Sequence, residues 1–323
     1  MILDIILIVL GIAAVLYGAD RLTAGVSALA RRMNIPEMVI GLTIVAAGTS
    51  APEFFVSFMS AIKGTPDMAV GNVVGSNIFN VLLIVGVTAM VTPISVTRAT
   101  VSKDMLWAIA SAVVFLCLCF DSLSPSINGN VISRLDGIIL LVIFSTFMGV
   151  TLKTAHKATP QQPSPQTSAK KESIAKNTMF FLLGLAMLIY GSNVFVESAS
   201  NVATALGVSE GIIGLTIVAG GTSLPELATS VVAAKKGNSA MAIGNVIGSN
   251  VFNTLAILGT TAVICPMQIN GISVVDISTM GLSMLVLWLF SFTKLRVERW
   301  EGAVLTAGFA AYLSFLLYSA IQH

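Results

Sequence analysis

Long apolar stretches follow one another along the chain, separated by short segments that carry polar, glycine or proline residues. Stretches of about 20 apolar residues match a helix that crosses the hydrocarbon core of a bilayer. The strands of a membrane barrel alternate apolar and polar residues, and these stretches do not. The pattern predicts about ten membrane-spanning helices, at residues 3–30, 36–62, 67–91, 103–121, 134–153, 176–205, 209–234, 240–264, 274–293 and 299–320.

The composition points to the same class. Of the 323 residues, 55% are hydrophobic and only 10% are charged. A soluble domain carries about 25% charged residues, so these charges are too few to cover a soluble surface. The net charge of +2 gives no reason to infer a nucleic-acid partner. The predicted fold class is therefore an all-α polytopic membrane protein.

One long polar stretch, residues 153–176, is rich in Pro, Gln, Ser and Lys. Such a segment buries little apolar surface and is expected to be a linker. It divides the chain into a first five-helix repeat, residues 1–152, and a second, residues 177–323.

The two halves share sequence. Residues 40–53 read IGLTIVAAGTSAPE and residues 213–226 read IGLTIVAGGTSLPE, identical at twelve of fourteen positions. Residues 70–80 read VGNVVGSNIFN and residues 243–253 read IGNVIGSNVFN. Both pairs are 173 residues apart, which indicates an internal duplication.

An odd number of spans in each half predicts that the second half enters the membrane in the opposite orientation, so the repeats are inverted. With both termini outside, most Lys and Arg fall in cytoplasmic segments, and only Lys63 and Arg134 fall outside. This distribution follows the positive-inside rule. We expect a multi-pass protein of the cell membrane with a cytoplasmic linker; the oligomeric state does not follow from the sequence.

Two glutamates, Glu53 and Glu226, lie well inside predicted spans at equivalent positions of the repeats. A charged side chain at mid-bilayer costs from about 2.5 to more than 10 kcal/mol, so each needs a compensating cation or proton. Pro52 and Pro225 precede them and are expected to break their helices. A broken helix frees carbonyl oxygens, which hard cations bind together with hydroxyls and carboxylates.

Polar side chains accompany each glutamate at helical spacing. If the local turns stay helical, four pairs each share a helix face: Thr49 and Glu53, Thr222 and Glu226, Ser76 and Asn80, and Ser249 and Asn253. An inverted two-fold relation then predicts one site at the midplane. The structural alternative, packing kinks with hydrogen-bonding Ser and Asn, stays open for Asn72, Asn77, Asn245 and Asn250. Lys63-Gly64 and Lys236-Gly237 are expected to be helix ends.

The segments GTSAPE…GNVVGSNIFN and GTSLPE…GNVIGSNVFN resemble the two alpha repeats of the cation/calcium exchanger superfamily, and the whole chain resembles prokaryotic sodium/calcium exchangers. The resemblance implies Na⁺/Ca²⁺ antiport by alternating access, with the first helix of each half sliding relative to the other eight. It implies no enzyme activity and no cofactor, with Ca²⁺ and Na⁺ as transported substrates. The calcium ligands it implies are Glu53, Glu226, Thr49 and Thr222. The sodium ligands it implies are Glu53, Glu226, Ala46, Ala219, Thr49, Thr222, Ser50, Ser223, Ser76, Ser249, Asn80 and Asn253.

One position departs from part of the superfamily, because potassium-dependent relatives carry Asp where this chain has Asn253. The site then has two carboxylates rather than three, which argues against K⁺ co-transport. Proton-coupled exchange with the same glutamates remains the alternative within transport. An intramembrane enzyme finds little support in the sequence, and a channel is disfavoured by the duplicated site.

Overall fold

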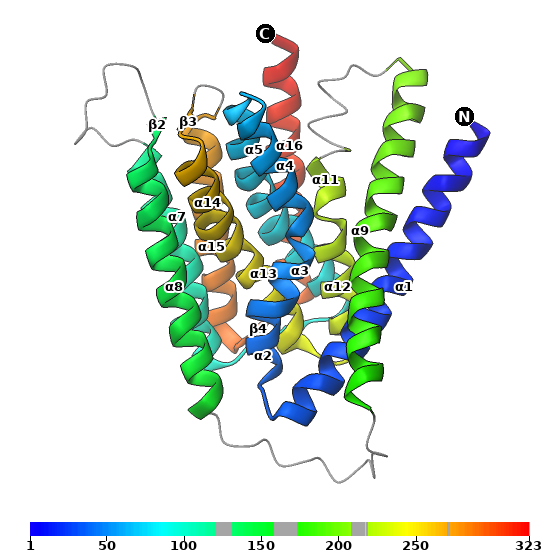
Figure 1. The fold of residues 1–323 in the computed structure, drawn as a ribbon, viewed down its shortest axis with the longest axis vertical. Helices are drawn as coiled ribbons and strands as arrows, with labels where there is room; N and C mark the ends of the chain where they lie inside the picture. The colour runs from blue at the N-terminus through cyan, green and yellow to red at the C-terminus, as the bar shows by residue number, and fades with distance from the viewer. Residues whose placement is uncertain (120–130, 158–172, 208–216, 218, 270–271, 323) are drawn as a thin grey trace.

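The computed structural model describes the chain except for residues 120–130, 158–172, 208–216, 218, 270–271 and 323. It is a bundle of helices with both chain termini at one end (Figure 1). The ends of α8 (Arg134–Lys157) and α9 (Ile174–Ala205) that flank residues 158–172 lie at the opposite end, which we call the linker end. Residues 153–157, assigned to the linker from the sequence, continue α8.

The remaining elements follow in chain order. In the first half they are α1 Ile2–Met33, α2 Glu37–Ile40, the π-helical η1 Gly41–Val45, α3 Ala46–Thr49, α4 Ala51–Ile62, α5 Pro66–Ile78, the π-helical η2 Phe79–Val85, α6 Gly86–Val91, β1 Ile94–Ser95, the π-helical η3 Thr100–Asp104, α7 Met105–Cys119 and β2 Val131–Ile132. In the second half they are α11 Ala219–Thr222, α12 Leu224–Lys235, α13 Ser239–Val251, the π-helical η5 Phe252–Ile257, α14 Leu258–Ile264, β3 Met267–Gln268, α15 Val274–Lys294, β4 Arg296–Val297 and α16 Arg299–Gln322.

Eight helices in the described part of the chain are long and apolar enough to cross a membrane, or nine if the bent pair Glu37–Thr49 and Ala51–Ile62 counts as one span. The chain is thus a multi-pass membrane protein. The seventh predicted span, residues 209–234, falls partly outside the described residues; its described part is α11 and most of α12. The count of ten therefore stays a prediction.

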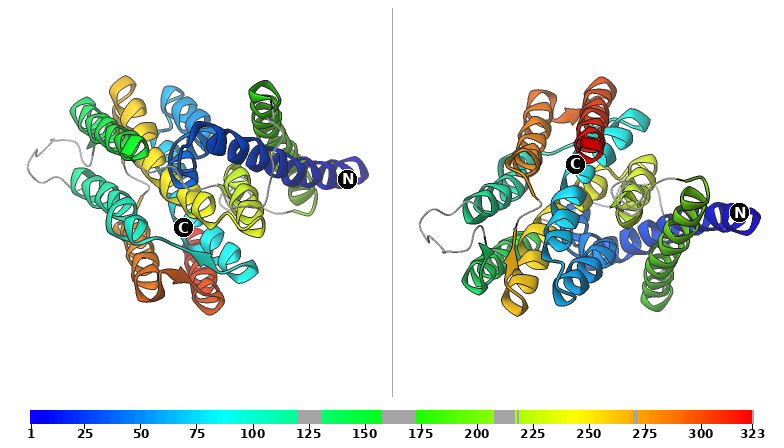
Figure 2. Two further views of the ribbon diagram at one scale, coloured as in Figure 1. Left: turned by 90° about the horizontal axis from the view of Figure 1, so that it is seen from below. Right: turned by 90° about the horizontal axis from the view of Figure 1, so that it is seen from above.

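Two 32-residue helices, α1 and α9, lie side by side along one flank of the bundle (Figures 1 and 2). Glycines allow their backbones to touch, as small residues do in membrane helix pairs. A Cβ atom on Gly18 would lie 2.8 Å from the Gly184 carbonyl oxygen, and one on Gly11 would lie 2.8 Å from that of Gly191. Any larger residue at these points has to push the two helices apart.

The helices that carry the GSNxFN segments form the centre of the bundle. In the 18-residue apolar windows of Pro66–Val91 and Ser239–Ile264, 72% of the residues are buried, against 22% in those of α1 and α9. Their apolar side chains, among them Val73 and Ile247, belong to the main hydrophobic core. The polar residues of these helices are therefore held in the protein interior.

Two short antiparallel ribbons tie the first half to the second at opposite ends of the bundle (Figure 1). In one, Ile94 of β1 pairs with Val297 of β4; in the other, Val131 of β2 pairs with Gln268 of β3. The sequence did not predict them, because two-residue strands carry no readable alternation.

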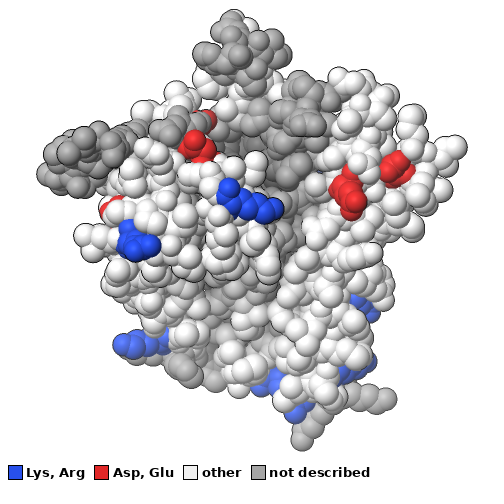
Figure 3. Space-filling view, turned by 45° about the horizontal axis from the view of Figure 1, so that its top comes forward, with Lys and Arg blue, Asp and Glu red and all other residues white. Residues whose placement is uncertain are grey.

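Charged side chains are distributed unevenly along the bundle. On the face shown in Figure 3, acidic side chains appear toward the end that carries the termini, and most Lys and Arg lie nearer the linker end. Lys63 and Lys236 are the residues that directly follow α4 and α12, and Gly64 and Gly237 then adopt φ values of +80°, which confirms both pairs as helix ends.

Candidate cation site

The second span is broken immediately before Glu53. Helices α3 and α4 meet at Ser50 and are bent by 47°, as the proline at position 52 predicts. Because Pro52 has no N–H, it cannot donate to the Gly48 carbonyl, which instead accepts from a backbone N–H at the end of α3. Glu53 falls in the first turn of α4, where the positive end of a helix favours a carboxylate.

The second half repeats this arrangement. Helix α11 ends at Thr222, α12 begins at Leu224, and Ser223 between them has the same conformation as Ser50, with φ −92° and ψ 8° against −81° and 9°. Glu226 lies in the first turn of α12. From α9, the Ser192 hydroxyl donates to the carbonyl of Gly221 just before the break, so this freed backbone region is bound to a neighbouring helix.

Each glutamate is hydrogen-bonded by the serine of the other half. Ser50 Oγ donates to Glu226 Oε1 over 2.9 Å, and Ser223 Oγ donates to Glu53 Oε1 over 2.9 Å. Ser223 Oγ also lies 3.3 Å from Ser76 Oγ on α5. The two broken helices and a central helix thus converge on one place, and the glutamates belong to a single cluster.

Both carboxylates are shielded from solvent and only half satisfied. Glu53 is 1% exposed and Glu226 is 0% exposed, and neither forms an ion pair with a described Lys or Arg. Oε2 of each has no hydrogen-bond partner in the described structure. A buried charge needs a compensating partner, so two free carboxylate oxygens in one cluster fit a bound cation or protons.

Asn72 and Asn245 support the backbone at the glutamates. Asn72 Nδ2 donates to the Glu53 carbonyl oxygen over 3.2 Å, and Asn245 Nδ2 donates to that of Glu226 over 3.4 Å. Each asparagine also donates to a serine that lies one turn after the glutamate on the glutamate's own helix, Ser57 for Asn72 and Ser230 for Asn245. These contacts fix the helix starts that carry the carboxylates.

Further asparagines extend the polar cluster between the central helices. Asn80 Nδ2 donates to Asn250 Oδ1 over 3.0 Å, and Asn253 Nδ2 donates to Asn77 Oδ1 over 3.2 Å. The amide oxygens of Asn80 and Asn253 are buried and have no partner among the described residues. They are two more acceptors of the kind that a cation binds.

The predicted helix faces hold only in part. The break at Ser50 falls between Thr49 and Glu53, so these two do not share a regular helix. Thr49 Oγ1 lies within hydrogen-bonding distance of the Val45 carbonyl, at 3.1 Å, and of Asn245 Oδ1, at 3.2 Å. The same correction applies to Thr222, which ends α11.

The π-helical segments change the spacing in the central helices. They begin at Phe79 and Phe252, between the serine and the second asparagine of each GSNxFN segment. Ser76 lies in the serine cluster, whereas the buried hydroxyl of Ser249 has no partner in the described structure. Ala46 and Ala219 begin α3 and α11, the last turns before the breaks.

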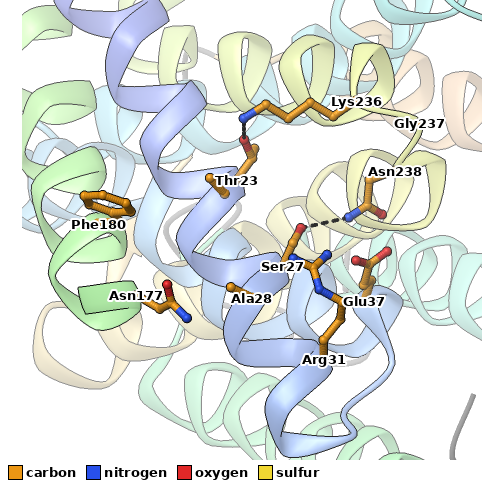
Figure 4. A pocket seen from close by; sticks show the side chains of 11 residues that line it. Thr23, Ser27, Ala28, Arg31, Glu37, Asn177, Phe180, Lys236, Gly237 and Asn238 are labelled. Carbon is orange, nitrogen blue, oxygen red and sulfur yellow. Dashed lines mark hydrogen bonds between the residues drawn. The ribbon is translucent and has the colours of Figure 1, made fainter. Parts of the chain in front are cut away.

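A separate cavity of about 400 Å³ opens near the linker end, away from the glutamates (Figure 4). Its walls include Arg31 of α1, Glu37 of α2 and Asn177 of α9. Lys236 crosses one side, with Nζ 2.7 Å from Asp20 Oδ1 and 2.9 Å from Thr23 Oγ1. None of the predicted ligands lines this cavity.

Comparison with known proteins identifies the family. The model of the family described as sodium/calcium exchanger protein matches two stretches that cover most of the chain, residues 3–153 and 176–318. The chain belongs to the sodium/calcium exchanger family. Members of this family are transporters and not enzymes.

Relatives match along the whole length of this exchanger-family chain. It is 38% identical to the putative antiporter CaxA of Alkalimonas amylolytica, over 99% of this chain and 100% of the relative. It is 30% identical to the sodium/calcium exchanger MaX1 of Methanosarcina acetivorans, over 98% and 99% of the two chains. The solved structure of the sodium-calcium exchanger NCX_Mj, soaked without Na⁺ and Ca²⁺, superposes with a TM-score of 0.83 at 30% identity, covering 98% of this chain and 99% of that one.

Proposed function

We propose that this protein is a secondary antiporter that exchanges Na⁺ for Ca²⁺ by alternating access at a midplane site built on Glu53 and Glu226. The observation that carries the proposal is the reciprocal contact of the two carboxylates with Ser223 and Ser50. One Ca²⁺ matches the charge of two carboxylates, and the same carboxylates balance two of several Na⁺ ions. The names of MaX1 and NCX_Mj support this pair of ions.

The ligands that we propose are the ones that the family resemblance implies. For Ca²⁺ they are Glu53, Glu226, Thr49 and Thr222. For Na⁺ the same four residues are joined by the carbonyls of Ala46 and Ala219 and by Ser50, Ser223, Ser76, Ser249, Asn80 and Asn253. The oxygen-only set fits both hard cations.

The two halves act as inverted repeats in this proposal. α1 and α9 slide along the rest of the bundle and open the site to one side at a time. The glycine contacts between α1 and α9 support their movement as a pair. The termini are outside, residues 158–172 are cytoplasmic, and the protein resides in the cell membrane. Cysteine labelling tests this topology: Lys63→Cys reacts with an impermeant maleimide from outside and Arg98→Cys does not, whereas the reverse result contradicts it.

A reconstituted transport assay tests the coupling ion. Proteoliposomes loaded with Na⁺ are diluted into Na⁺-free buffer that contains ⁴⁵Ca²⁺, with the membrane potential clamped by K⁺ and valinomycin. We expect uptake that requires the Na⁺ gradient and persists when a protonophore collapses the pH gradient. Uptake that requires a pH gradient and does not depend on the Na⁺ gradient refutes Na⁺ coupling and favours the proton-coupled alternative.

A further inference from the structure

Four asparagines, two from each half, form a hydrogen-bonded cluster between the central helices. Asn80 and Asn253 belong to the proposed ligands, while Asn77 and Asn250 do not. We propose that Asn250 and Asn77 are positioning residues that turn the amide oxygens of Asn80 and Asn253, respectively, toward the bound cation, and that only position 77 tolerates an acceptor in place of its amide nitrogen. This inference rests on the proposed cation site, whichever ion drives exchange.

The orientation of Asn250 is set by a backbone carbonyl. Its Nδ2 donates to the carbonyl oxygen of Asn77 over 3.4 Å, and a carbonyl only accepts hydrogen bonds. The two ends of an amide are distinguished by the groups they face, so Oδ1 of Asn250 is the end directed at Asn80. Asn80 therefore presents Nδ2 to Asn250, over 3.0 Å, and its own Oδ1 points elsewhere, buried and without a partner in the described structure.

Asn77 orients Asn253 in the same way but is itself held differently. Its Nδ2 donates to Thr254 Oγ1 over 2.7 Å and lies 3.4 Å from the Met280 sulfur. Its Oδ1 accepts from Asn253 Nδ2 over 3.2 Å, which leaves Asn253 Oδ1 buried and without a partner among the described residues.

These orientations matter because the two ends of an amide have opposite polarity toward a cation. An amide oxygen donates a lone pair to Na⁺ or Ca²⁺, whereas an NH₂ group directs its protons at the ion. When the nitrogen of Asn80 or Asn253 is already bonded to a neighbour, the ion meets oxygen. Loss of the neighbour lets the amide turn and present its nitrogen.

Asn77 and Asn250 differ in the group that their amide nitrogens face, because Asn77 faces the Thr254 hydroxyl. A hydroxyl both donates and accepts, so Thr254 can bond either end of the group at position 77. Val81 occupies the equivalent place in the first half, and Asn250 instead faces a peptide carbonyl that cannot donate. A carboxylate at position 77 is therefore accommodated, while one at position 250 places an oxygen against the Asn77 carbonyl oxygen.

Two isosteric substitutions with equal charge test this difference: Asn77→Asp and Asn250→Asp. Each protein is reconstituted, and the half-saturating Ca²⁺ concentration and maximal rate of gradient-driven ⁴⁵Ca²⁺ uptake are measured. We expect Asn77→Asp to stay within about threefold of wild type in half-saturating Ca²⁺, because Thr254 donates to the new carboxylate. Asn250→Asp is expected to raise it by about tenfold or more, the size expected for opposed buried acceptors.

Adding Thr254→Val to Asn77→Asp tests whether the new carboxylate depends on the Thr254 hydroxyl. Adding Thr261→Val instead is the matched control. Thr261 lies further along the same helix, is also buried, and its hydroxyl has no partner in the described structure. Added to Asn77→Asp, Thr254→Val is expected to raise half-saturating Ca²⁺ about tenfold, while Thr261→Val leaves it unchanged. This comparison decides the matter even where Asn250→Asp does not fold.

The inference is overturned if Asn77→Asp and Asn250→Asp raise the half-saturating Ca²⁺ concentration equally. It is also overturned if Thr254→Val does not change that concentration in Asn77→Asp. Failure of the proposed function is seen separately, in wild-type protein that shows no Na⁺-driven uptake. The comparison is then made with the gradient that does drive uptake, or by Ca²⁺-dependent thermal stabilisation of the purified protein. A general packing defect lowers stability without Ca²⁺ and leaves half-saturation unchanged.

Discussion

Ser50 donates a 2.9 Å hydrogen bond to Glu226, a residue that belongs to the other half of the chain. Ser223 and Glu53 form the reciprocal bond, also of 2.9 Å. Each serine lies at the break of its own helix, so the break in one half orients the carboxylate of the other. The proposed cation site therefore depends on both halves at once.

Removing either serine hydroxyl is expected to weaken cation binding to a similar degree. Ser50→Ala and Ser223→Ala each delete one bond to a buried carboxylate, a loss of about 1.5–3 kcal/mol that corresponds to a rise of roughly tenfold or more in half-saturating Ca²⁺. The measurement is ⁴⁵Ca²⁺ uptake in proteoliposomes. Ser145→Ala is the control, because that exposed hydroxyl bonds the Leu141 carbonyl of its own helix. A shift in one serine variant alone contradicts the reciprocal arrangement.

The glycine contact between α1 and α9 predicts a loss of stability on small-to-large substitution. A Cβ on Gly18 meets the Gly184 carbonyl oxygen at 2.8 Å and the Leu188 nitrogen at 2.9 Å. Gly18→Ala is expected to cost about 1–3 kcal/mol and to lower the melting temperature in detergent. Gly149→Ala is the matched control, since its Cβ meets nothing within 4 Å. Equal melting temperatures for the two variants refute close packing of these helices.

Lys236 holds the turn after α12 against α1, through Thr23 (Figure 4) and through Asp20. An exposed ion pair alone contributes little, but here one ammonium group contacts three oxygen atoms at 2.7–2.9 Å. Lys236→Gln is expected to open the adjoining cavity and increase labelling of Ser27→Cys by an impermeant maleimide. Lys63→Gln is the control, because Lys63 is the equivalent residue of the first half and forms no ion pair within the described residues. Unchanged labelling of Ser27→Cys in Lys236→Gln argues against the contact.

The sequence predicted the broken helices and their glutamates because proline and glycine act locally. Pro52 and Pro225 remove backbone donors wherever they occur, and Glu53 and Glu226 were conspicuous as unpaired charges in apolar stretches. The repeat then linked the two positions, and the family comparison confirmed the exchanger resemblance.

Contacts between the halves could not be read from the sequence. Nothing in the GTSxPE segments tells whether Ser50 bonds Glu53 or Glu226, because that choice is made by tertiary packing. The π-helical turns at Phe79 and Phe252 also escaped prediction, since the residues there favour an ordinary helix equally well. The roles of Asn77 and Asn250 depend on these turns and on Thr254, which has no equivalent in the first half.

In the proposed mechanism, Glu53 and Glu226 form one shared cation site. Isothermal titration of purified protein with Ca²⁺ in Na⁺-free buffer tests it most directly, with Glu53→Gln and Glu226→Gln beside wild type. Both glutamines still accept the serine hydrogen bond, so the fold is expected to be kept. We predict one Ca²⁺ per wild-type chain and no measurable binding in either single variant. Two Ca²⁺ per chain, or one Ca²⁺ retained with wild-type affinity in either variant, contradicts a shared site.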